Sequence, residues 1–204
     1  MFGSVVLGLM VLIAVCAPLL DTMDPSSIDP AWRNKKPGVE HLKTLPDGTE
    51  REWTYRMGTD TLGRDTYSRV IYGARVSLAV GILVAALSLA IGLVIGLVSG
   101  YIRWLDAIVM RVMDGLMAIP GILLAIALVS LADAGLTTVI LAITIPEIPR
   151  VVRLVRSIVL SIREEPYVEA AISVGTRMHL ILFRHVLPNT IAPLIVQGTY
   201  ICAS

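Results

Sequence analysis

Long runs without a charged side chain leave few possible folds for this chain of 204 residues. The longest run, residues 76–102, has 27 residues and no charge. A helix needs about 20 apolar residues to cross the hydrocarbon core of a bilayer. In that core every backbone polar group must be bonded within the protein, so such runs fold as helices. The composition agrees with a membrane protein, since 55% of residues are hydrophobic, 16% are charged and the mean hydropathy is +0.77.

Five largely apolar runs, this one included, predict an all-α integral membrane protein, built as a multi-span helical bundle. The predicted spans are residues 1–20, 76–102, 115–132, 136–152 and 187–204. A cleaved signal peptide is the alternative for the first run, although the run lacks a basic lead and a clear cleavage site. Pro120 predicts a kink in the third span. The fourth span must tilt, break at its prolines, or place Glu147 and Arg150 at the membrane face or in a polar cavity, and we expect both at its cytoplasmic end.

The segments between the runs are polar. Residues 21–75 carry nine acidic and nine basic residues and a turn signal at residues 46–48, which predicts an extramembrane loop. Within it, Asp60, Arg64, Asp65 and Arg69 lie at helical spacing and predict local ion pairs. Residues 103–111 are expected to form a short loop. The net charge of +1 implies no nucleic-acid partner.

One face of the second span has almost no side-chain bulk. Ser88, Gly92, Gly96 and Gly100 recur every four residues. Small residues at this spacing let another helix approach closely, so the pattern predicts helix packing rather than chemistry.

Residues 163–189 form the longest polar-rich break in the second half of the chain. Pro166 suits the first turn of a helix. That helix would carry one narrow apolar face, formed by Tyr167, Ala170, Ala171 and Val174. Gly175 is expected to end it in the left-handed conformation. Thr176 is expected to cap a second short helix, which Pro188 stops or kinks. The face predicted for this second helix consists of Met178, Ile181, Leu182 and His185.

The order of residues in this break resembles the EAA loop of the membrane subunits of binding-protein-dependent ABC importers. The matching residues are Glu169-Ala170-Ala171, then Gly175, then His185-Val186-Leu187-Pro188. The general pattern has isoleucine where His185 stands, and "RHVLPN" is similar to the dipeptide, oligopeptide and nickel branch. Three other segments, residues 57–78, 110–126 and 150–164, resemble the same branch.

The resemblance implies a permease of the type I ABC importer kind, with a cytoplasmic EAA loop at residues 157–187 and residues 21–75 outside the cell. It implies coupling to separate ATP-binding cassette ATPase subunits through the EAA residues. It also implies a second homologous permease subunit, an extracytoplasmic solute-binding protein and the plasma (inner) membrane as the location. The coupling residues carried over are Glu169, Ala170, Ala171, Gly175, Leu187 and Pro188. Basic residues do not fix the orientation, since residues 21–75 carry nine and the opposite side eight.

Permeases of this branch continue through one more span, so the resemblance implies that the last span is missing here. We therefore expect a fragment or a truncated product that does not by itself form a working translocation path. We also expect that a basic cytoplasmic lead has been lost from the start.

The sequence has no motif for catalysis, a cofactor or a metal. It lacks the phosphate-binding loop of ATPases, so ATP hydrolysis is expected on a partner. His179 and His185 are six residues apart, which favours partner contact or solvation over metal ligation. Two alternatives remain: a non-transporting assembly subunit, and an ion-driven secondary transporter. Internal repeats, expected of the second alternative, are not visible.

Overall fold

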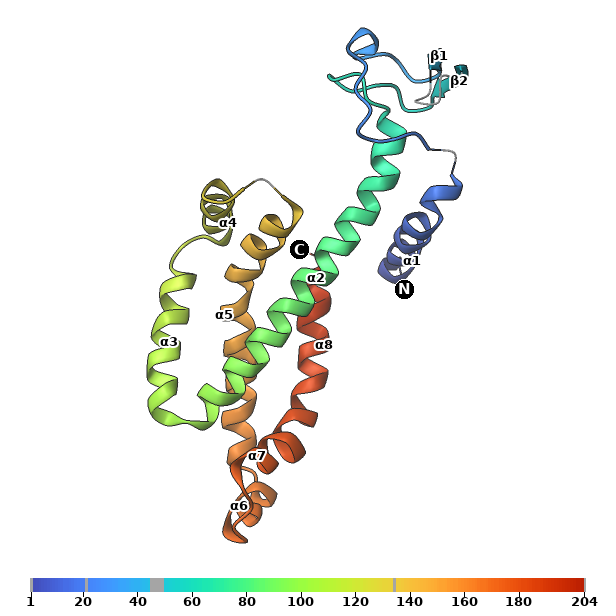
Figure 1. Cartoon of the computed structure of the whole chain (residues 1–204). Helices are drawn as coiled ribbons and strands as arrows, with labels where there is room; N and C mark the ends of the chain where they lie inside the picture. Colours follow the sequence, from blue (N-terminus) through green and yellow to red (C-terminus); the bar gives the residue numbers. More distant parts are fainter. Residues whose placement is uncertain (1, 21, 45–49, 134, 204) are drawn as a thin grey trace. The chain divides into compact units, whose positions relative to one another are not determined.

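The structure is a computed structural model that describes residues 2–20, 22–44, 50–133 and 135–203 (Figure 1). The chain divides into two compact units, Met1–Ala79 and Val80–Ser204, which are described in turn. Helices dominate, as predicted, and one β-hairpin is the exception to the predicted all-α class.

The first unit contains a short apolar helix and a hairpin. Helix α1 (Phe2–Cys16) continues into a 3-10 turn, η1 (Ala17–Leu19). A second 3-10 turn, η2 (Pro30–Trp32), precedes strands β1 (Val39–Thr44) and β2 (Glu50–Tyr55). The strands pair antiparallel from Val39 with Tyr55 to Thr44 with Glu50. The prediction of an extramembrane loop did not include this hairpin, and the predicted turn at residues 46–48 lies outside the described residues.

Aromatic rings hold the hairpin to the turn η2. The centroid of the His41 ring lies 3.9 Å from that of Trp32 and 6.3 Å from that of Tyr55, and the centroids of Trp32 and Tyr55 are 6.0 Å apart. His41 Nε2 is 3.4 Å from Asp29 Oδ2. Burial, with repulsion from Asp29 and Asp65, raises the pKa of Tyr55. These contacts form a small packed cluster within the first unit.

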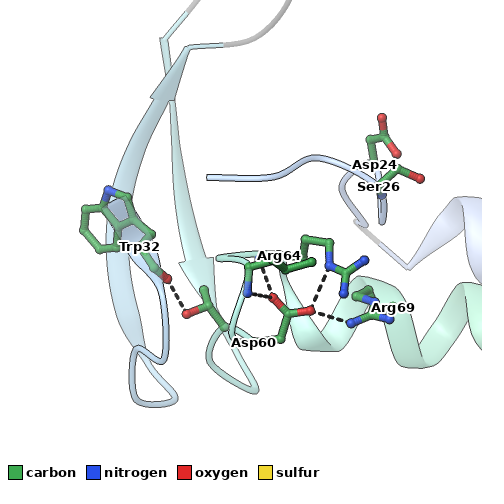
Figure 2. Close-up of polar contacts among 8 residues, drawn as sticks. Asp24, Ser26, Trp32, Asp60, Arg64 and Arg69 are labelled. Atoms are coloured by element: carbon green, nitrogen blue, oxygen red, sulfur yellow. Dashed lines mark hydrogen bonds and ion pairs between the residues drawn. The ribbon is translucent and has the colours of Figure 1, made fainter. Parts of the chain in front are cut away.

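Asp60 is the polar centre of the turn that precedes α2 (Thr66–Tyr101) (Figure 2). Its Oδ1 accepts from the amides of Leu62 and Arg64, both at 2.9 Å. Its Oδ2 accepts from Arg64 Nε at 2.8 Å and from Arg69 Nη1 at 2.5 Å. Burial alone would raise the pKa of Asp60, but the amide bonds from Arg64 and Leu62 and the Arg64 guanidinium outweigh it and lower this pKa to about 2.

The predicted ion pair of Asp60 with Arg64 is thus confirmed, although it forms across a turn instead of along a helix. Asp60 also pairs with Arg69, nine residues later, which helical spacing does not predict. Asp65 does not pair with Arg69. Its Oδ2 accepts from the Ser68 amide at 3.1 Å and from the Ser68 hydroxyl, so it caps the start of α2. Gly63 has φ +78°, and a Cβ there would lie 1.7 Å from the Asp29 carbonyl oxygen, so only glycine fits this turn.

The second unit is a helical bundle. After α2 it contains α3 (Arg103–Met117), α4 (Gly121–Ser130), α5 (Leu136–Arg163), α6 (Pro166–Ser173), α7 (Met178–Ile181), a π-helical segment η3 (Leu182–Val186) and α8 (Leu187–Ala203). Among the described residues, two helices are long and apolar enough to cross a membrane, Thr66–Tyr101 and Met178–Ala203. Helices α3 and α4 add a third span if that bent pair is counted as one.

The remaining predicted spans fall outside this set for different reasons. Helix α1 is apolar but has only 15 residues. Helix α5 has 28 residues, but charged side chains interrupt it from Glu147 onward. Both are helical, as predicted, and their membrane crossing stays a prediction.

Two predictions for the region between α2 and α5 need correction. Residues 103–111 are not a loop, because α3 begins at Arg103. The chain also breaks at Pro120 instead of kinking there, with an angle of 85° between α3 and α4. Pro120 lies just before the first residue of α4, where a missing N–H is tolerated.

Charged pairs hold α3 along α5. Arg156 forms two bonds with Asp106, Nε to Oδ1 and Nη2 to Oδ2, the second at 2.6 Å. Arg153 Nη2 is 2.5 Å from Asp114 Oδ1. Asp106, one of the charges that make residues 103–111 look like a loop, therefore helps to fix a helix against its neighbour.

Helices α2 and α5 run parallel and pack through the predicted small-residue face. A Cβ added at Gly92, Gly96 or Gly100 would lie 2.5, 2.7 or 2.8 Å from a Val Cβ of α5, at Val151, Val155 and Val159 respectively. Ser88, on the same face, is fully buried and donates its hydroxyl to the Val84 carbonyl. Each of these three glycines thus packs against one valine of α5.

Helix α8 packs on another face of α2 through glycines that sequence reasoning missed. A Cβ at Gly198 would lie 2.7 Å from Leu89 Cδ1, and one at Gly81 would lie 2.9 Å from the Cys202 carbonyl oxygen. The core between the helices includes Val84, Ala85, Val151, Val155, Val159, Leu194 and Ile201.

Candidate functional site

The break at residues 163–189 folds into a short helical hairpin between α5 and α8 (Figure 1). Its base is fixed by Arg163, whose Nη1 donates to the carbonyls of Gly100 and Tyr101 at 3.2 and 3.3 Å. The guanidinium also lies over the Tyr101 ring, 5.3 Å from its centroid. The last turn of α5 is therefore tied to the last turn of α2, and the hairpin starts from a fixed point.

Helix α6 starts as predicted. Pro166 occupies its first turn after Glu165, whose backbone is extended. Val168 is fully buried and joins the core cluster with Ile162 and Ile181, so it anchors α6 to the bundle. Because Val168 packs inward, the other faces of α6 point outward.

The predicted small apolar face of α6 is largely the outward face. Tyr167, Ala170 and Val174 are exposed, Val174 by 86%, and Ala171 is half-buried. Glu169 is exposed beside them. The alanines on this open helix face permit close approach by another backbone, and Glu169 places a charge beside them.

Gly175 ends α6 in the left-handed conformation, with φ +85°. Its amide donates to Ile172 O at 2.9 Å, and the Thr176 amide donates to Ala171 O at 3.0 Å. This is the paired bonding of a Schellman motif. Thr176 was predicted to cap the second helix, but its backbone belongs to this motif and Arg177 occupies the cap position of α7, without a side-chain bond. No atom lies within 4 Å of a Cβ built at Gly175, so its backbone conformation alone selects glycine.

The second helix of the hairpin continues into α8. Pro188 was predicted to stop or kink it, but the chain remains helical and widens to a π turn at η3, where the Leu187 amide donates to Leu182 O. Pro188 has no N–H for the carbonyl four residues earlier, and its ring crowds that carbonyl, which a wider turn accommodates. Leu187 is half-buried and Pro188 is exposed at this junction.

An aromatic contact joins the two arms of the hairpin. The rings of Tyr167 and His185 lie 5.7 Å apart between centroids, and Ile181 and Val186 are buried beneath them. Of the predicted face of the second helix, Ile181 is the fully buried member, while Met178, Leu182 and His185 are half-buried. No local pattern indicates that Tyr167 and His185 meet, because they lie on different helices.

The hairpin holds no arrangement typical of catalysis. Across the described residues no three His, Cys, Asp or Glu side chains gather as metal ligands. Its features are an open helix face, a left-handed cap at Gly175 and helical connections to α5 and α8.

Comparison with known proteins agrees with the family resemblance seen in the sequence. Residues 88–201 match the family described as binding-protein-dependent transport system inner membrane component. A probable peptide ABC transporter permease from Sinorhizobium fredii is 52% identical over all 204 residues, which is 65% of its own length. A dipeptide transport system permease from Alkalihalophilus pseudofirmus is 40% identical over 97% of this chain and 60% of its own length. A glutathione transport system permease from Escherichia coli is 44% identical over 70% of this chain and 48% of its own length.

This chain therefore spans less than two thirds of the length of these relatives. The family match nonetheless covers more than half of the chain, including the seam between α2 and α5 and the whole hairpin. The chain belongs to the family of binding-protein-dependent transport system inner membrane components.

Proposed function

We propose that this chain is a transmembrane subunit of an ATP-driven importer, which forms part of a translocation path and couples to a separate ATPase through α6. The observation that carries the proposal is the outward face of α6, held by one buried anchor, Val168, and a left-handed cap at Gly175. A helix fixed in this way moves as a body with α5 and α8 when a partner pushes on it.

Each coupling residue has a distinct role in this proposal. Glu169 supplies a charge for the ATPase surface, and Ala170 and Ala171 let its backbone approach. Gly175 sets the angle between the arms of the hairpin. Leu187 and Pro188 join the hairpin to α8 at the π turn.

The proposed topology places the hairpin in the cytoplasm and residues 21–75 outside, in a plasma (inner) membrane. Helices α2 and α5 then cross in the same direction, which their parallel packing supports. The five spans at residues 1–20, 76–102, 115–132, 136–152 and 187–204 are part of this proposal.

The proposed cargo class is peptides or similar small solutes, because relatives are named for peptide, dipeptide and glutathione transport. The proposed complex also contains ATP-binding cassette subunits, a second homologous permease subunit and an extracytoplasmic solute-binding protein.

Co-purification tests the proposal against the two alternatives, a non-transporting assembly subunit and an ion-driven secondary transporter. The chain, carrying an affinity tag and expressed with the ATPase of its own system, should retain that ATPase through membrane extraction. Glu169→Lys should weaken retention, while Gly115→Ala, at an open site on α3, should not. A chain that reaches the membrane but never retains the ATPase would refute the docking role.

A further inference from the structure

Helix α5 carries four arginines, and Arg150 is the one bonded within its own helix. Arg153 and Arg156 pair with carboxylates of α3, and Arg163 with carbonyls of α2. Arg150 Nη1 lies 3.0 Å from Glu147 Oε1, one turn earlier. The Arg150 side chain is 48% exposed and that of Glu147 is 14% exposed.

The packing between α2 and α5 gives the depth of this pair. Residue 89 is the midpoint of the uncharged run 76–102 of α2. Gly92, three residues further on, faces Val151, and the two helices run parallel. Glu147 and Arg150 therefore lie near the level of that midpoint. This depth differs from the cytoplasmic end of residues 136–152 that is expected from the sequence, and it implies that the fourth span continues beyond residue 152 along α5, which ends at Arg163.

Polar and apolar residues share the face of α5 around the pair, where Leu154 follows Arg150 by four residues. Pro146 and Pro149 have no N–H, so the carbonyls of Ala142 and Ile145 lack their usual helical donors. Ser157 and Ser161, both exposed, continue the face of Glu147 and Arg150 toward the hairpin. The valines that fit the glycines of α2 lie on an adjacent face, since Val151 follows Glu147 by four residues.

A charged face at this depth is costly against lipid, and charges within spans generally face a cavity or a substrate pathway. We propose that Glu147 and Arg150 form a cargo-binding subsite in the translocation path, which reads the opposite charges of a zwitterionic small peptide.

The chemistry of the pair fits that ligand. The planar guanidinium of Arg150 can bind the terminal carboxylate of a peptide through two parallel bonds. The Glu147 carboxylate can accept from the terminal ammonium. Without cargo the two side chains neutralise each other, so neither charge is left unpaired. The proposal rests on the proposed function, since it assigns a site to the cargo of that importer.

Uptake of labelled dipeptides tests the subsite. Cells would express this sequence within a complete permease chain, together with the other subunits of its system, and free dipeptide would be compared with its C-terminally amidated and N-acetylated forms. The unsubstituted chain should prefer the free dipeptide. The double variant Glu147→Gln/Arg150→Gln should lower uptake of the free form by about tenfold or more, the equivalent of one charge-assisted bond, and abolish the preference.

Arg153→Gln is the matched control, because it makes the same change three residues away on an arginine that pairs with α3. It should keep the preference for free termini. Membrane levels of every variant would be measured by immunoblot. If the double variant does not reach the membrane, Arg150→Lys is tested in its place. It keeps the charge but loses the two parallel bonds of the guanidinium, so it should partially reduce the preference for free termini.

The failures are distinguishable. Absence of peptide uptake by the unsubstituted chain overturns the proposed function and this inference with it. Normal uptake in which the double variant, or Arg150→Lys in its place, keeps the full preference overturns the inference alone. Loss of the second permease subunit from the complex with unchanged preference also overturns it, because the pair would then belong to a subunit interface.

Discussion

Gly96→Ala tests the close approach of α2 and α5. A Cβ at this position would lie 2.7 Å from Val155 Cβ and 3.0 Å from the Val152 carbonyl oxygen. Carbon atoms in contact lie about 3.5–4.0 Å apart, so the two helices must separate by about 1 Å at this point. Both obstructing atoms are close to or part of the backbone of α5 and cannot swing aside.

The expected loss is small but measurable. Overpacking costs about 1–3 kcal/mol, whereas alanine gains about 1 kcal/mol over glycine in helix propensity. The net loss should therefore be about 1 kcal/mol, rising to about 2 if α5 cannot shift. A change of about 1 kcal/mol moves the Tm of a chain of this size by roughly 2–4 °C.

The assay is thermal unfolding of the purified chain in one detergent, with Gly115→Ala as control. No atom lies within 4 Å of a Cβ at Gly115, so that variant should match or exceed the parent in Tm. Adding Val155→Gly to Gly96→Ala removes the nearest obstructing atom and should restore the close approach of the helices. The reasoning is refuted if Gly96→Ala is as stable as Gly115→Ala.

Three further predictions concern the hairpin, the topology and the outer turn. Gly175→Val should cost about 1 kcal/mol or more in left-handed strain, and both it and Glu169→Lys should reach the membrane yet lose substrate-stimulated ATP hydrolysis in the assembled complex; normal stimulation in both would contradict the coupling role. In a cysteine-free background, a cysteine at position 61, in place of Thr61, should react with a membrane-impermeant thiol reagent in intact cells, and one in place of His179 should not. Labelling at position 179 and not at position 61 would show that the proposed topology is reversed. The pKa of Asp60 is lowered to about 2 from 3.8, so its carboxylate stabilises the fold fully above about pH 4 and loses this effect as the pH falls toward 2. Hydrogen exchange of the turn, corrected for intrinsic rates, should show this loss in the parent and not in Asp60→Asn, and equal pH dependence in both would rule out Asp60 as its source.

The sequence predicts those parts of the fold that depend on local spacing. The face of Ser88, Gly92, Gly96 and Gly100 recurs every four residues, which is visible without knowing the partner helix. The left-handed cap at Gly175 is equally local, because glycine after a helical run is itself the signal.

Other features depend on partners that are distant in the sequence. Asp106 and Asp114 look like loop residues until α5 supplies Arg156 and Arg153. Gly198 and Gly81 have no repeat that marks them, so their close contacts with α2 and α8 become visible only in the fold. Thr176 has the right chemistry for a cap, but the Schellman motif already uses its backbone amide.

The repeated contact of glycines with valines does not by itself fix the register between α2 and α5. A shift by four residues, about 6 Å, would again place glycine opposite valine at two of the three positions. Nearly equivalent alignments would then compete during assembly. Arg163 removes this ambiguity, because its bonds to Gly100 and Tyr101 use the end of α2, which occurs once. A single arginine thus selects one alignment from a repeating series, and its loss should yield a mixture of offset bundles before it yields an unfolded chain.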